Sequence, residues 1–182
     1  MYKTQKLDAT GLEPISRDRR RPLMDAKLPR AVETPNIRAG ESWILERFTV
    51  ECSGGRSAGA LLVVDEATRR PIAIEVDVAI GTQHLVDTLN HLRAVRGIPR
   101  RICVDNYAQG AYAAAAFSRW LVRHGIEQSR VSLGSPWSKS PSEEWAHEFC
   151  REVKLSCREE TIDQLRQRAR SWLAEVNSAQ GS

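Results

Sequence analysis

The sequence has no long apolar run. No stretch approaches eighteen consecutive apolar residues; the strongest one, Ala60–Val64, has five, whereas a membrane-spanning helix needs about 20. No apolar segment follows Met1–Lys6 either, so we expect no secretory signal. These absences argue against a membrane protein and predict a cytoplasmic location.

Paired cysteines are absent as well. The four cysteines, Cys52, Cys103, Cys150 and Cys157, stand at irregular spacings, and no two of them form a Cys-x-x-Cys pair. Structural zinc sites usually contain such pairs, so a zinc site is not expected. Free, mostly buried thiols in a reducing compartment are the better interpretation.

Charge is present but unevenly placed. The chain has 182 residues, of which 41% are hydrophobic and 27% charged, which is enough for one domain with a packed core. Residues 1–40 hold nine Lys and Arg against five Asp and Glu, and so account for the whole net charge of +4. They lack hydrophobic periodicity and contain four prolines. We therefore predict a basic arm or linker over 1–40 and a folded domain over 41–182.

Four arginines cluster within this arm, namely Arg17, Arg19, Arg20 and Arg21. A cluster of this kind suits the phosphate backbone of DNA, because each guanidinium can neutralise a phosphate. These four residues are therefore candidate DNA contacts. A solvated, disordered tail is the alternative that composition leaves open.

The first half of the predicted domain has the pattern of three consecutive strands. Residues 42–50 are rich in aromatic and branched side chains, and 60–65 begin as a continuous apolar run. Residues 72–78 alternate apolar positions as far as Val78. Short turns separate the three segments, which predicts an antiparallel meander.

The second half alternates helices with short strands. Thr82 is predicted to cap a helix that ends at Gly97 and Pro99. The segments expected after it are a strand at 101–105, a helix near 111–124, a strand at 131–133, a helix starting at Pro141 and a helix from about 162. This order predicts an α/β fold of the ribonuclease H-like type, with a mixed five-stranded sheet of three antiparallel and then parallel strands, flanked by helices.

Short motifs in this order resemble one known family. They are Pro35-Asn36, Trp43–Glu46, Leu62–Arg69, Arg96–Pro99, Val104–Asn106, Gly134–Pro136 and Glu143. Together they resemble the retroviral-type integrase core, or DDE domain, of bacterial insertion-sequence transposases. The resemblance implies metal-dependent DNA cleavage and strand transfer in transposition. It also implies DNA as a partner, a homo-oligomer and no small-molecule cofactor.

By position, the resemblance assigns three carboxylates to the catalytic and metal-binding site: Glu46, Asp105 and Glu143. A site of this kind holds two Mg²⁺ or Mn²⁺ ions about 4 Å apart, which stabilise the attacking and leaving oxygens of phosphodiester transfer. Carboxylate oxygens are the ligands that these ions prefer. Trp137 and Lys139, in the loop before Glu143, are further candidate DNA contacts. Trp137 is equally compatible with packing back on the domain.

Each of the three carboxylates also has a purely structural interpretation. Asp105, followed by an asparagine, is a common turn former. Glu143 fits a capping box with Ser140. Glu46 stands in an alternating strand, where a glutamate often faces solvent.

Two departures from the family keep a second hypothesis open. The chain has Glu46 where the family has aspartate, and Tyr107 where the family has glycine. A misplacement of about 1 Å in a catalytic group can cost on the order of a hundredfold in rate. The alternative is therefore a catalytically inactive, transposase-derived module that binds DNA or protein, with Mg²⁺ or Mn²⁺ required only for the active form. A fold-sharing interaction module without a nucleic-acid partner is the third hypothesis.

Overall fold

The structure is a computed structural model, and it describes residues 37–51, 56–104, 111–112, 114–130, 140–156 and 161–179. All of these residues lie within one structural unit of the chain, residues 35–182. The boundary that the sequence places near residue 40, between arm and domain, stays a prediction.

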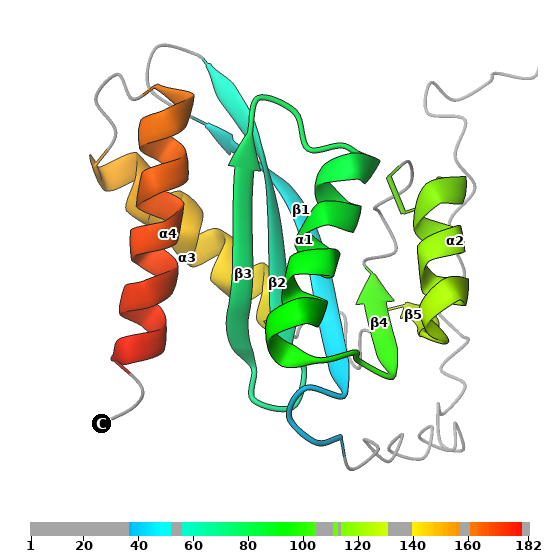
Figure 1. Cartoon of the computed structure of the whole chain (residues 1–182). Helices are drawn as coiled ribbons and strands as arrows, with labels where there is room; N and C mark the ends of the chain where they lie inside the picture. The colour runs from blue at the N-terminus through cyan, green and yellow to red at the C-terminus, as the bar shows by residue number, and fades with distance from the viewer. Residues whose placement is uncertain are drawn as a thin grey trace, which may run out of the picture. The chain divides into compact units, whose positions relative to one another are not determined.

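Five strands of the described residues form one mixed sheet in the spatial order β3-β2-β1-β4-β5. Their bounds are β1 (Ser42–Glu51), β2 (Ser57–Asp65), β3 (Arg70–Asp77), β4 (Arg101–Val104) and β5 (Glu127–Arg130). The pairs β1–β2 and β2–β3 are antiparallel, whereas β4 runs parallel to β1 and β5 parallel to β4 (Figure 1). The predicted sheet, antiparallel first and then parallel, is confirmed.

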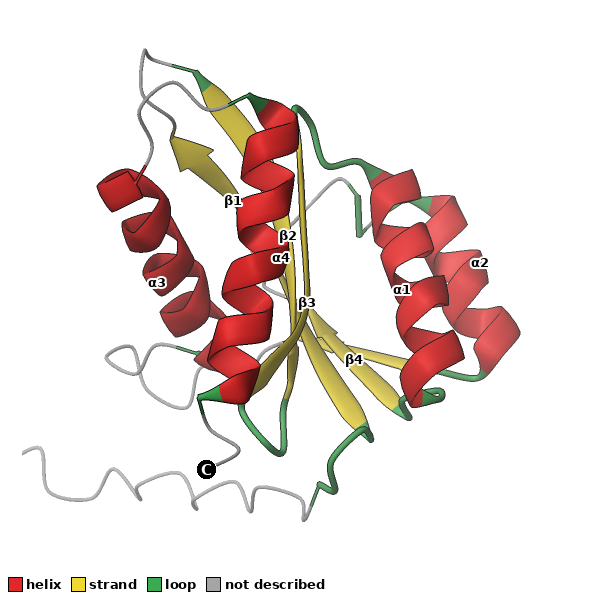
Figure 2. Cartoon of the chain, turned by 60° about the vertical axis from the view of Figure 1, so that its left-hand side comes forward, coloured by secondary structure: helices red, strands yellow, loops and turns green. Residues whose placement is uncertain are grey.

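Helices cover both faces of this sheet (Figure 2). On one face lie α1 (Thr82–Arg96) and α2 (Ala115–His124), and on the other lie α3 (Pro141–Ser156) and α4 (Ile162–Ser178). None of the helices in the described part of the chain is both long and apolar enough to cross a membrane.

The strand β2 shows why the sheet needs two helical layers. Leu61, Leu62, Val63 and Val64 all have 0% exposure. Because side chains alternate along a strand, Leu61 and Val63 join the core under α1 and α2, while Leu62 and Val64 join the core under α3 and α4. The continuous apolar run is thus explained by burial on both faces.

The fifth strand lies earlier in the sequence than predicted. β5 spans Glu127–Arg130, and the predicted residues 131–133 lie outside the described residues. Gly125, at φ +63°, ends α2 in the left-handed conformation, and Ile126 is buried directly after it. The strand then begins at the edge of the sheet, where Glu127 and Gln128 are exposed. An edge strand with polar, solvent-facing residues has no apolar pattern. The strand was therefore predicted at the next apolar segment, residues 131–133.

Three other predicted boundaries were wrong by a few residues. The helix α2 begins at Ala115 rather than near 111, because Ala111 and Tyr112 are buried in a turn. At the start of α1 the N-cap is Gly81, not Thr82. The strand β3 ends at Asp77, and Val78 is 70% exposed. The helix start at Pro141 and the helix end at Gly97 are confirmed.

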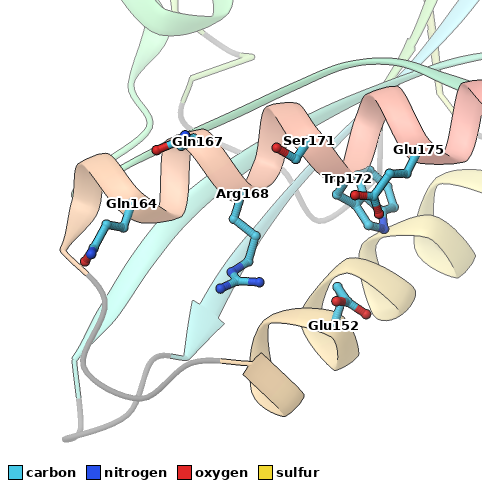
Figure 3. Close-up of a pocket in the computed structure, with 7 residues that line it drawn as sticks. All are labelled: Glu152, Gln164, Gln167, Arg168, Ser171, Trp172 and Glu175. Carbon is cyan, nitrogen blue, oxygen red and sulfur yellow. The ribbon is translucent and has the colours of Figure 1, made fainter.

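The helices α3 and α4 lie side by side and leave a polar groove of about 360 Å³ between them (Figure 3). Glu152 of α3 and Arg168 and Glu175 of α4 line it. The buried Trp172 lies beneath them, and its ring packs edge-on against Phe149 at a centroid distance of 5.2 Å. Aromatic packing therefore joins the two helices below a charged surface.

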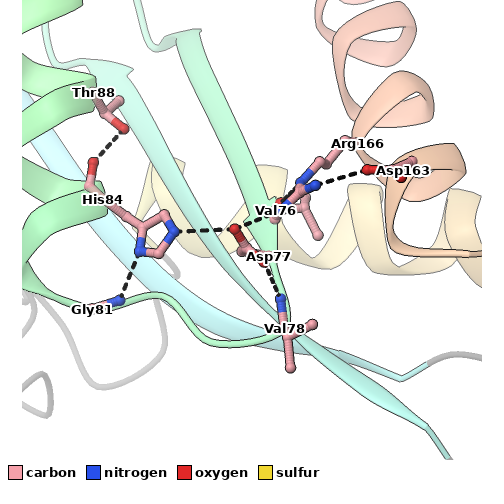
Figure 4. Close-up of polar contacts among 8 residues, drawn as sticks. All are labelled: Val76, Asp77, Val78, Gly81, His84, Thr88, Asp163 and Arg166. Atoms are coloured by element: carbon pink, nitrogen blue, oxygen red, sulfur yellow. Dashed lines mark hydrogen bonds and ion pairs between the residues drawn. The ribbon is translucent and has the colours of Figure 1, made fainter.

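One carboxylate at the end of β3 forms hydrogen bonds with a helix on each face of the sheet (Figure 4). Asp77 accepts hydrogen bonds from Nη2 of Arg166, on α4, at 2.7 Å and from Nε2 of His84, on α1, at 3.1 Å. The backbone N–H of Val78 donates to its other oxygen at 2.7 Å. The hydrogen bond from Arg166, followed by the one from Val78, lowers the pKa of Asp77 below its ordinary value of 3.8.

Replacing Asp77 by asparagine is expected to lower the free energy of unfolding by about 2 kcal/mol at neutral pH, because the hydrogen bonds to a charged acceptor are lost. Since folding depresses the pKa, this stabilisation is complete above pH 3.8 and falls as the pH drops toward the folded-state value. Urea unfolding measured from pH 7 down to pH 3 should therefore show the difference between wild type and D77N shrinking with acid. The control is D163N, because Asp163 also binds Arg166 but its side chain is 82% exposed. A difference between wild type and D77N that does not depend on pH contradicts this account.

Candidate active site

The first candidate carboxylate, Glu46, is buried on the sheet face that carries α3 and α4. Its backbone pairs with Leu62 of β2, and its side chain is only 9% exposed. It lies on the same face of β1 as Ile44, which belongs to the core under these helices. The interpretation that placed Glu46 in solvent is wrong, because α3 packs over this part of β1.

The second described candidate, Glu143, takes part in the cap of α3. Its Oε2 accepts a hydrogen bond from the backbone N–H of Ser140 at 2.9 Å, and its own N–H donates to Ser140 Oγ at 3.2 Å. The capping box that the sequence indicated is therefore formed. The described residues donate no hydrogen bond to the other oxygen, Oε1.

A serine between these residues joins Glu46 to the start of α3. Ser142, with 0% exposure, donates its hydroxyl to Oε2 of Glu46 at 3.1 Å. Its Oγ also lies 2.8 Å from Oγ of Ser140. The structure thus brings β1 and the first turn of α3, 96 residues apart in the sequence, into direct contact one residue before Glu143.

The strand β4 ends beside the same part of β1. In the parallel pairing of these strands Val104 is the partner of Leu45, the residue before Glu46. Asp105, which follows Val104 in the sequence, lies outside the described residues. The candidate DNA contacts also lie outside them: Arg17, Arg19, Arg20, Arg21, Trp137 and Lys139.

The two described carboxylates are suitable ligands for a hard divalent cation. Glu46 and Glu143 offer carboxylate oxygens, which Mg²⁺ and Mn²⁺ prefer to nitrogen or sulfur. Within the described ranges no three His, Cys, Asp or Glu side chains form a group that could hold a metal ion. A three-carboxylate site consequently needs Asp105 as well as these two residues.

Ser142 is the residue near this site that sequence reasoning missed. The motif Ser-Pro-Ser-Glu predicts a capping box between Ser140 and Glu143, and nothing in it marks Ser142. Its complete burial and its bond to Glu46 depend on how α3 packs on β1. No local pattern in the sequence carries that information.

Comparison with known proteins finds relatives among bacterial insertion elements. An uncharacterized 39.2 kDa protein of insertion element IS476 from Xanthomonas euvesicatoria is 28% identical over 133 residues, which cover 73% of this chain and 37% of that protein. An uncharacterized 31.7 kDa protein of insertion element IS407 from Burkholderia multivorans is 24% identical over 109 residues, covering 60% of this chain and 39% of that protein. The chain thus spans less than two fifths of the length of these relatives. No family model matches it.

Two solved structures with a similar fold come from retroviruses. The catalytic core domain of HTLV-2 integrase, in complex with magnesium and in a trimeric form, matches with a TM-score of 0.56 at 12% identity, over 74% of this chain and 84% of that one. A chain of the simian T-cell lymphotropic virus intasome, in complex with PP2A regulatory subunit B56 gamma, matches with a TM-score of 0.55 at 15% identity, over 73% of this chain and 48% of that one. These likenesses confirm the predicted ribonuclease H-like α/β fold.

Proposed function

We propose that this chain, which is similar in sequence to proteins of bacterial insertion elements and has the fold of retroviral integrase cores, is the integrase-core domain of an insertion-sequence transposase and cuts DNA and transfers strands. The relatives are about two and a half times as long as the part that aligns. Other segments of such a protein would then supply recognition of the element ends. In this proposal DNA is the partner and a homo-oligomer is the working form.

One observation carries the proposal: the contact between Ser142 and Glu46 at 3.1 Å. It links the strand that bears the first candidate carboxylate to the helix turn that bears the third. The end of β4 at Val104, beside Leu45, supports a position for Asp105 at the same edge. Rigid strands and a helix start are suitable supports, since catalytic groups need to be held within about 0.5 Å of the productive geometry.

Glu46, Asp105 and Glu143 would hold the divalent ions through their carboxylate oxygens. When bound, these ions stabilise the attacking and leaving oxygens of phosphodiester transfer. Ser142 fixes the direction of the Glu46 carboxylate by donating to Oε2. The arginines of the arm, Arg17 and Arg19–Arg21, would bind DNA phosphates, together with Trp137 and Lys139.

The proposal is tested by assaying the full chain on supercoiled plasmid with Mn²⁺, Mg²⁺ or EDTA. We expect nicking with either ion and none with EDTA, since carboxylates alone do not stabilise the leaving oxygen. D105A should abolish nicking and the metal-induced rise in melting temperature. D87N, at a helix position of α1 on the opposite face of the sheet, is the control that keeps both. A wild-type chain with neither metal-dependent nicking nor a metal-dependent melting shift contradicts the proposal.

A specific observation favours the second candidate, an inactive transposase-derived module that binds DNA or protein. Oε2 of Glu143 is engaged by the cap of its own helix, where it accepts a hydrogen bond from the backbone N–H of Ser140. The double variant with Glu46→Asp and Tyr107→Gly restores the residues of the related family. Nicking that appears only in this variant identifies the present chain as inactive, whereas nicking by the wild type rejects the second candidate.

A further inference from the structure

We propose that the helix pair α1 and α2, on the face of the sheet opposite Glu46, binds the phosphate backbone of DNA. Only the identity of the partner, DNA, rests on the proposed function. The two helices lie side by side (Figures 1 and 2), and the Nε1–H of Trp120, on α2, donates to Oδ1 of Asn90, on α1, at 2.9 Å. Each helix leads directly into one of the parallel strands β4 and β5, so their C-terminal ends lie at the same edge of the sheet.

Two arginines lie close together one helical turn beyond this hydrogen bond. Arg93 follows Asn90 by three residues, and Arg123 follows Trp120 by three, so each stands one turn nearer the C-terminal end of its helix. Between them lies His124, whose ring packs edge-on against Trp120 at a centroid distance of 4.8 Å. Burial, followed by the positive charges of Arg93 and Arg123, lowers the pKa of His124 below its ordinary value of 6.5. Both guanidinium groups therefore act on the same imidazole, one from each helix.

No carboxylate among the described residues forms an ion pair with these two arginines. The one acidic residue of the two helices is Asp87, nearer the start of α1, where it accepts a hydrogen bond from Gln83 at 2.8 Å. Glu127, at the start of β5, is the register partner of Arg101. Arg101 stands two residues before Cys103, which belongs to the core under α3 and α4, so Arg101 and Glu127 share that other face. The positive charge between α1 and α2 is thus not neutralised by this part of the chain.

The helices on the two faces of the sheet differ in charge. Helices α1 and α2 hold four arginines against one aspartate, a net charge of +3, whereas α3 and α4 hold five basic and six acidic residues. The four arginines, all exposed, are Arg93, Arg96, Arg119 and Arg123. The negative ends of two helix dipoles amount together to about one elementary charge. Three arginines stand in the last turns of α1 and α2, so a positive excess remains at these helix ends.

This surface suits a phosphate backbone better than the surface of another protein. A guanidinium binds a phosphate through two parallel N–H···O hydrogen bonds. The residues exposed beside the arginines of α2 include Ala115 and Ala116, which are small enough for a backbone to approach closely. Val122 is the only large apolar residue exposed on α2, whereas the centre of a protein interface is usually apolar and rich in aromatic residues. Several arginines without an apolar centre therefore indicate a polyanion.

The test is the fluorescence anisotropy of a short fluorescein-labelled DNA duplex, titrated with the full chain at several salt concentrations in EDTA, which prevents nicking. The double variant R93Q/R123Q removes the two neighbouring charges. Each phosphate contact contributes about 0.9 to the slope of log K against log salt, so we expect the slope to fall by about 2 and the Kd in about 50 mM salt to rise tenfold or more. The melting temperature should not fall, because both side chains are exposed and their charges repel each other.

The matched control is R151Q/R170Q, which removes two exposed arginines from α3 and α4 and changes the net charge equally. Its slope and Kd should equal those of the wild type. Equal weakening by both double variants overturns the proposal, since binding then responds to net charge alone. So does a wild type that does not bind the duplex. An R93Q/R123Q variant that binds like the wild type, while the wild type nicks plasmid in Mn²⁺, overturns this surface and leaves the proposed function standing.

Discussion

Replacing Glu46 by glutamine is expected to lower metal-dependent nicking by about 100-fold or more, with the domain still folded. Changing a group that only supports a metal ligand already costs about 10–100-fold in affinity or activity, and loss of a ligand's charge costs at least as much. The amide oxygen of glutamine can still accept the hydroxyl of Ser142, which now lies 3.1 Å from Oε2. The size of the side chain is unchanged, so packing against α3 is preserved.

The measurement is the initial rate of plasmid nicking in Mn²⁺, together with the melting temperature. E75Q is the matched control, because Glu75 is a glutamate of the same sheet with an exposed side chain. Its rate and melting temperature should equal those of the wild type. A rate for E46Q within about threefold of the wild type would remove Glu46 from the metal site, whatever the role of the other carboxylates.

Replacing Phe149 by alanine is expected to destabilise the domain by about 4 kcal/mol, in the range found for large-to-small changes in packed cores. Phe149 has 0% exposure and joins α3 to both β1 and α4. Its ring packs against Trp172 at 5.2 Å and against Phe48 at 6.3 Å between centroids. Alanine leaves a cavity that the surrounding strands and helices cannot close.

Urea unfolding followed by tryptophan fluorescence gives this difference directly. Val122→Ala is the control, since Val122 on α2 is 81% exposed and its loss should cost less than about 0.5 kcal/mol. The substitution F149L should cost less than F149A, because leucine fills part of the volume. An F149A variant as stable as V122A would show that the core under α3 and α4 is not packed as described.

Sequence patterning predicted most of the sheet for an identifiable reason. Hydrophobic periodicity reports burial, and β1, β2 and β4 are buried strongly enough to show it. β5 is polar and lies at the sheet edge, so it carries no such signal. The start of α2 was missed because alanine favours helix in isolation, whereas the packing of Ala111 and Tyr112 in a turn decides the outcome.

The candidate site was less accessible to sequence reasoning. The resemblance to the transposase family was enough to nominate Glu46, Asp105 and Glu143, and the capping box could be predicted from Ser140 and Glu143. The alternation of side chains along a strand shows which residues share a face of the sheet, but it does not show which helix covers that face. The burial of Glu46 and its bond to Ser142 therefore required the packing of α3 on β1.

The double role of Asp77 has a consequence for how the domain comes apart. One carboxylate oxygen serves as the acceptor for α1 through His84 and for α4 through Arg166. When either helix detaches, the shared carboxylate is held less firmly for its hydrogen bond to the other helix. The energies of the two contacts are therefore coupled rather than additive. The layers on opposite sides of the sheet should consequently melt as a single cooperative unit, without a stable intermediate in which one layer is formed and the other is open.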